Sequence, residues 1–234
     1  MQLYLFFALH WIHVLSSVIW LGTLYFFNFY LTAFLEKARP EARVEVFSKL
    51  VPLAMHGFNW STFATVLSGW LLYFHSLNTV GIAAFFNWPY GLAISLGGLL
   101  GTAMFLNGWF IMHPKQERVV ASATRVANGE EPDPQAPLLS RHVVLTSRVN
   151  LLLSIPMLFL MVAATHDPPM FLMTDAHAPI WFWIIVLAIV GAVEIVPILG
   201  PRGGFKRGIE TLGGALTAGF VLLAVFYILI RTVL

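Results

Sequence analysis

The feature that most constrains this chain is the length of its charge-free stretches. Residues 50–114, for example, include no Asp, Glu, Lys or Arg; Lys49 precedes this stretch and Lys115 follows it. A helix needs about 20 mostly apolar residues to cross a bilayer, so this stretch is long enough for two crossings. The composition agrees, with 59% hydrophobic residues, 10% charged residues and a mean hydropathy of +0.81. These values exclude an ordinary soluble domain.

Six such apolar segments predict an all-α integral membrane protein that forms one domain over residues 1–234. The first segment has no basic region before it and no small-residue cleavage site after it, so we expect a retained span and not a signal peptide. We expect spans at about residues 3–35, 51–77, 88–113, 143–166, 176–199 and 208–231. Residues 114–142 form a predicted cytoplasmic linker, with a surface helix over 115–128 and a Pro-rich, acidic, non-helical stretch over 130–134.

The basic residues predict the orientation. Cytoplasmic loops retain Lys and Arg, and all but one of the 13 basic residues fall in alternate connecting segments. Arg231 is the exception. Both termini are therefore predicted to lie outside. The basic residues of the three inner segments are Lys37, Arg39, Arg43 and Lys49; Lys115, Arg118, Arg125, Arg141 and Arg148; and Arg202, Lys206 and Arg207.

Small residues at helical spacing predict where helices approach one another closely. Gly97 and Gly101 form a G-x-x-x-G pair, and Ala215 and Gly219 have the same spacing. Such pairs favour close backbone contact in membranes.

The cysteine count restricts the possible cofactors. With no Cys, the chain has no disulfide, thiolate metal site or covalently attached c-type haem. A redox cofactor would be bound non-covalently, with one of the eight His as the most suitable ligand. A net charge of +2 gives no reason to expect a nucleic-acid partner.

Two histidines are predicted to lie at the same outer depth. At helical rise, His13 is roughly 34 Å from the inner end of its span, and His166 is roughly 27 Å from Arg148. His10 lies one turn further out than His13, and His75 ends the second span. Interfacial histidines also bond carbonyls and lipid head groups, which is the simpler interpretation for any one of them.

Two imidazoles from facing helices are the ligands that a b-type haem needs. We therefore predict haem b between His13 and His166, with His10 or His75 as the alternative partner. Trp20 lies two turns below His13 and is a candidate contact for the haem edge, although Trp residues near span ends also serve as membrane anchors. Copper or zinc would accept the same imidazoles but is less favoured without thiolates or a carboxylate cluster.

Ionisable groups within the bilayer are the other candidate site. Glu194 is predicted to lie within the apolar core, where a carboxylate is protonated or paired. Arg148 and Asn150 begin the fourth span on the inner side. A structural Arg148–Glu194 contact is the favoured interpretation, and a proton-transfer or quinone-site role for Glu194 is the alternative.

Several short segments occur in a consistent order along the chain. They are residues 13–22 with His13, Trp20 and Gly22; 58–63, Phe-Asn-Trp-Ser-Thr-Phe; 101–107; 129–134; 147–150, Ser-Arg-Val-Asn; His166; Glu194; and Gly200-Pro201. Together they resemble the membrane domain of the bacterial membrane-bound urate oxidases, over nearly the whole chain. Asn59 and Ser61 stand where that family has Lys and Glu, which are two groups that could hold a substrate.

The resemblance implies a redox function and a place in the inner membrane of a bacterium. Longer family members carry a C-terminal c-type cytochrome domain, and this chain resembles a short, stand-alone version without it. Our leading hypothesis is a haem-b electron-transfer protein or a subunit of a respiratory complex. The alternatives are a urate or small-molecule oxidoreductase that reduces an external cytochrome c, and a cofactor-free accessory subunit of a larger membrane complex.

Overall fold

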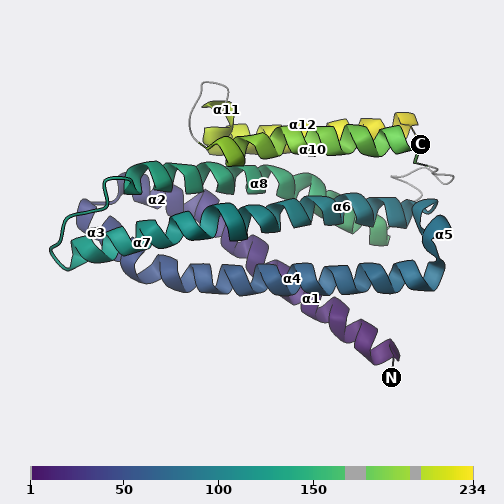
Figure 1. Cartoon of the computed structure of the whole chain (residues 1–234), viewed down its shortest axis with the longest axis horizontal. Helices are drawn as coiled ribbons and strands as arrows, with labels where there is room; N and C mark the ends of the chain where they lie inside the picture. Colours follow the sequence, from purple (N-terminus) through teal and green to yellow (C-terminus); the bar gives the residue numbers. More distant parts are fainter. Residues whose placement is uncertain (1, 167–177, 201–206, 234) are drawn as a thin grey trace.

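The chain folds as a bundle of long helices (Figure 1). The computed structural model describes residues 2–166, 178–200 and 207–233, and every regular element in these ranges is helical. The helices α4, α6, α7, α8, α10 and α12 run along the length of the molecule, whereas α1 crosses them obliquely (Figure 1). The elements are α1 Gln2–Tyr25, η1 Phe26–Leu31, α2 Thr32–Lys37, α3 Pro40–Glu45, η2 Val46–Leu50, α4 Val51–Val80, α5 Ile82–Phe86, α6 Pro89–Leu106, η3 Asn107–Met112, α7 His113–Ala127, α8 Ala136–His166, α10 Ile180–Leu199, α11 Arg207–Glu210 and α12 Leu212–Val233.

Among the described residues, five helices are long and apolar enough to cross a membrane. They are Tyr4–Lys37, Pro89–Ala127, Ala136–His166, Ile180–Leu199 and Leu212–Thr232. This confirms a helical, multi-pass membrane protein. The second predicted span, α4, is not among the five although it is a continuous helix of 30 residues. Its buried polar side chains, including Asn59, Thr62 and Thr65, lower its hydropathy and lie against neighbouring helices.

Several helix ends differ from the predicted bounds. The inner linker is mostly helical, because α7 ends at Ala127 and α8 begins at Ala136, before the predicted residue 143. Residues 130–134 are non-helical, as predicted. The start of the fifth span at residue 176 and the basic residues Arg202 and Lys206 lie outside the described residues.

The central helix of the bundle is α8, the most buried of the five candidate spans. The predicted small-residue pairs are the places where other helices approach it. A Cβ on Gly97 of α6 would lie 3.0 Å from Met161 Cε, and a Cβ on Gly219 of α12 would lie 2.8 Å from the Leu152 carbonyl oxygen. The structure therefore confirms both pairs as packing sites.

Two of the π-helical segments lie immediately before a proline. Pro52 follows η2, and Pro114 follows η3 within one continuous helical rod. Proline lacks an N–H and its ring clashes with the preceding turn, so a wider turn accommodates it. The Lys115 ammonium donates to the Ile111 carbonyl oxygen, at 3.1 Å, within this wider turn.

Candidate functional site

His13 is held in a fixed orientation between α1 and α4. Its Nδ1 lies 2.9 Å from the Thr65 carbonyl oxygen and 3.3 Å from Ser68 Oγ. Because a carbonyl only accepts, Nδ1 carries the proton and Nε2 retains its lone pair. A metal-ligating histidine typically donates its other N–H in this way, which orients the ring.

Gly69 makes room for the His13 ring. A Cβ at this position would lie 2.9 Å from Cε1 and 3.2 Å from Nδ1 of the imidazole. Any side chain here would displace the ring or separate the helices. The position therefore requires glycine for close approach, and its backbone has no positive φ.

The other histidines near this end of α1 and α4 are joined through an aromatic ring. The Phe6 ring lies 4.4 Å from the His10 ring and 4.8 Å from the His75 ring, centroid to centroid. His10 Nδ1 donates to the carbonyl oxygen of Phe6, one turn back in its own helix, at 3.1 Å. His75 thus lies on the same pair of helices as His13 and remains available as an alternative ligand.

His166 lies at the end of α8 and is exposed. Its Nδ1 lies 3.2 Å from the Val162 carbonyl oxygen, and its Nε2 has no hydrogen-bond partner among the described residues. Among the described residues, its polar contacts are all within α8. By contrast, Tyr25 at the end of α1 and Asn28 in η1 contact α8 far from His166, at Ser154 and Ser147. Equal depth therefore does not bring His13 and His166 into contact here, and their pairing stays a prediction.

Trp20 is fully enclosed in the core, with 1% of its surface exposed. It does not belong to an interfacial belt of tryptophans. Its indole N–H has no hydrogen-bond partner among the described residues.

The inner half of the bundle contains a network of buried amides around α8. The amide nitrogen of Asn107, the first residue of η3, lies 3.0 Å from Asn150 Oδ1 and 3.1 Å from Glu194 Oε1. Asn150 in turn donates to the Met104 carbonyl oxygen at 3.0 Å. Asn107 thereby joins η3, α8 and α10.

The expected contact between Arg148 and Glu194 is not formed, and this prediction was wrong. Arg148 donates instead to the Asn28 carbonyl oxygen at 3.1 Å, while Asn28 Nδ2 donates to Ser147 Oγ at 2.8 Å. Residues two apart on a helix point to opposite sides. Arg148 therefore faces η1, and Asn150 faces α6 and η3. The bridging Asn107 was missed because a single sequence does not show lateral neighbours.

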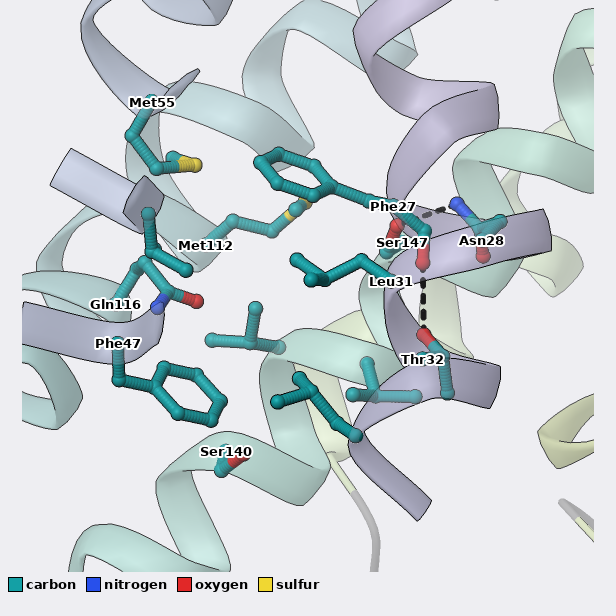
Figure 2. Close-up of a pocket in the computed structure, with 14 residues that line it drawn as sticks. Phe27, Asn28, Leu31, Thr32, Phe47, Met55, Met112, Gln116, Ser140 and Ser147 are labelled. Carbon is teal, nitrogen blue, oxygen red and sulfur yellow. Dashed lines mark hydrogen bonds between the residues drawn. The ribbon is translucent and has the colours of Figure 1, made fainter. Parts of the chain in front are cut away.

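A small cavity lies beside this network (Figure 2). Its volume is about 70 Å³, and its wall includes Asn28, Ser147, Thr32 and Gln116 among mostly apolar side chains. A water molecule occupies about 30 Å³ in the liquid, so the cavity can hold a few waters but not a macrocycle. A haem would have to bind elsewhere.

The described residues contain no group of three or more His, Asp or Glu side chains arranged to hold a metal ion. A multi-ligand copper or zinc site therefore has no support in this part of the chain. Haem requires only axial ligands, and the fixed imidazole of His13 fits that requirement.

Comparison with curated proteins and with solved structures gave no match. The family model described as urate oxidase N-terminal matches residues 83–198. The matched segment includes the Asn107–Asn150–Glu194 network and His166. It begins after α1, which carries His13, and after α4, which packs against it. On this match, the chain belongs to the urate oxidase N-terminal family.

Proposed function

We propose that this protein is a membrane electron-transfer component of the urate-oxidase type that binds haem b near the outer ends of α1 and α4. The observation that carries the proposal is the bond from His13 Nδ1 to the Thr65 carbonyl oxygen. It fixes the ring against Gly69 and leaves Nε2 free for iron. The iron would supply one-electron redox chemistry, and the protein would tune its potential through ligation and burial.

His166 is the proposed second ligand, because its Nδ1–H also bonds a carbonyl and its Nε2 is free. His75, which lies on α4 beside Phe6, is the competing candidate. Trp20 is proposed to lie below the macrocycle, with its unpartnered indole N–H available to it.

The proposed topology has six crossings with both termini outside. In support, α4 runs alongside the rod formed by α6, η3 and α7 for the length of the bundle, and the start of α1 and the end of α12 lie toward the same end of the molecule (Figure 1). The distribution of basic residues favours the outer face of the membrane for that end, and the proposed membrane is a bacterial inner membrane.

The family match favours a second candidate function. A urate-oxidising enzyme of this family would take electrons from a purine or a related small molecule and pass them to an external cytochrome c. A cofactor-free accessory subunit is the third candidate.

Optical spectroscopy of the purified full chain, expressed with ample haem, separates the three candidates. A haem Soret band without purine-dependent reduction supports the electron-transfer protein. Reduction of the haem by urate supports the enzyme. A folded protein without haem rejects the proposal and favours the accessory subunit.

A further inference from the structure

A second, larger pocket lies between α4 and the rod formed by η3 and α7. Its volume is about 510 Å³, within the range of small-molecule sites. The side chains that define it are His56, Asn59, Trp60, Trp109, His113 and Gln116. Met55 and Gln116 also line the smaller cavity of Figure 2, so these two side chains lie between the two spaces.

Three buried polar atoms on the residues that line this pocket have no hydrogen-bond partner among the described residues. They are Asn59 Oδ1, Trp109 Nε1 and Gln116 Nε2. Asn59 and Gln116 are only 9% and 7% exposed, so bulk water does not supply the missing hydrogen bonds. Buried polar groups are nearly always paired in native proteins. Neighbouring protein atoms cover these two donors and one acceptor, so a ligand or ordered water in the pocket would pair with them after a small movement of the pocket wall.

Other contacts fix the orientation of these groups. Asn59 Nδ2 donates to His113 Nδ1 at 3.0 Å, which directs Oδ1 away from that histidine. His113 Nε2 lies 3.4 Å from Glu117 Oε1. The acceptor is thus held by a chain of contacts from α4 to α7.

Aromatic rings line the space between these polar groups. The Trp60 ring lies 6.3 Å from the His56 ring, and the Trp109 ring lies 6.4 Å from the His113 ring. Such walls favour a flat ring, because aromatic faces stack. The unpartnered groups require that this ring carry oxygen acceptors and an N–H or O–H donor.

The charge of the pocket excludes anionic ligands. No Lys or Arg lines it, and its only carboxylate is that of Glu117. A phosphate or carboxylate ligand would lack a counter-charge, so the ligand is neutral.

The surroundings of the pocket indicate where the ligand comes from. Along the same helix as Asn59, Leu53 is 74% exposed and Trp60 is 59% exposed. Large apolar side chains that are exposed in a membrane protein face lipid, so the ligand can enter from the bilayer.

We propose that this pocket binds the head group of a membrane quinone or quinol. The carbonyl oxygens of a quinone would accept from Gln116 Nε2 and Trp109 Nε1, and a quinol hydroxyl would donate to Asn59 Oδ1. The ring would lie between the tryptophans, with its isoprenoid tail in lipid. This site does not depend on haem at His13.

Photoaffinity labelling of the full chain in nanodiscs tests the proposal. The probe is an azido-benzoquinone with a decyl tail, and unlabelled decyl-benzoquinone is the competitor. We expect competed labelling within residues 52–60 and 109–121. Labelling spread over all lipid-facing helices, without competition, would overturn the proposal.

Two variants remove donors with little change of shape. Trp109→Phe retains an aromatic ring, and Gln116→Leu retains similar volume; each should weaken competition about tenfold, which corresponds to the loss of one good hydrogen bond. Trp88→Phe and Gln135→Leu, at exposed positions elsewhere, are the matched controls. Unchanged competition in the Trp109 variant, with melting equal to that of the parent chain, would contradict the site.

Neutral xanthine, a water-soluble ring with similar hydrogen-bonding groups, distinguishes the source of the ligand. Protection by xanthine but not by the quinone would reject a membrane ligand. Labelling should be unaffected by His13→Ala, so failure of the haem assignment and failure of the quinone site are distinguishable.

Discussion

The outer His13 site and the inner network around Asn107 both place polar groups between helices, yet they differ in what remains free. Asn107 donates its two amide hydrogens to Asn150 and Glu194, so it links these two side chains and has no hydrogen left to donate. His13 uses only Nδ1, on a backbone carbonyl, and keeps Nε2. The comparison indicates that the inner network stabilises the bundle and the outer imidazole is available for chemistry.

The largest expected effect on stability is at the inner network. Asn107→Leu would leave Asn150 Oδ1 and Glu194 Oε1 without this donor, so the free energy of unfolding should fall by about 1–3 kcal/mol. Chemical denaturation in mild detergent measures it, with Asn78→Leu at the exposed end of α4 as the control. Equal stability of the two variants would remove the structural role assigned to the network.

Gly69→Ala is expected to act on the outer site more than on folding. The new methyl group would lie within 3.0 Å of the His13 ring, so the ring must move from the Thr65 carbonyl. We expect a reduced haem content or a shift toward high-spin iron, with an unfolding change of about 1 kcal/mol. Gly22→Ala, where a methyl group meets no other atom within 4 Å, is the matched control. An unaltered spectrum would show that the close contact is not needed for ligation.

A double-mutant cycle between Arg148→Gln and Glu194→Gln tests whether Arg148 is energetically separate from the network around Asn107. Because the two side chains contact different partners, we expect a coupling energy below about 0.5 kcal/mol. A coupling energy above about 1 kcal/mol would be evidence for the Arg148–Glu194 ion pair expected from the sequence.

The smallest expected effect is at the surface turn after α7. The Gln135 backbone N–H and the Arg118 guanidinium hold the pKa of Asp133 below its ordinary value of 3.8. A lowered pKa in the folded state means that this stabilisation is fully present above the unfolded pKa and is lost as pH falls from there through the folded pKa. Asp133→Asn should therefore slightly lower the melting temperature at pH 7 and have no effect near pH 2. A difference in melting temperature between the variant and the parent chain that stays constant from pH 7 to pH 2 would show that the Asp133 carboxylate is not its cause.

Much of the fold could be predicted from the sequence, because the bilayer imposes one long apolar helix for each crossing. Gly97 and Gly219 were identified as contact positions from spacing alone. The polarity of α4 was harder to interpret, because its buried Thr65 and Ser68 face α1 and not lipid.

The candidate sites were only partly predictable. The depth of a residue in the membrane follows from its position along a helix, so the depth of His13 could be predicted. Which other helices pack beside it does not follow from the residue count. The two-residue spacing of Arg148 and Asn150 places them on opposite faces of α8, and the expected Arg148–Glu194 contact did not take account of this spacing. The pocket beside Asn59 and Gln116 depends on the approach of two distant segments, which no local pattern predicts.

Ligand rescue tests the central claim most directly. His13→Gly removes the proposed axial imidazole, and free imidazole can then diffuse into the vacated space. The account predicts a low-spin haem spectrum in the parent chain, its loss in His13→Gly, and its return on addition of imidazole, whereas His10→Gly keeps the spectrum throughout. A His13→Gly protein that retains the parent spectrum without imidazole would contradict the assignment of His13 as a haem ligand.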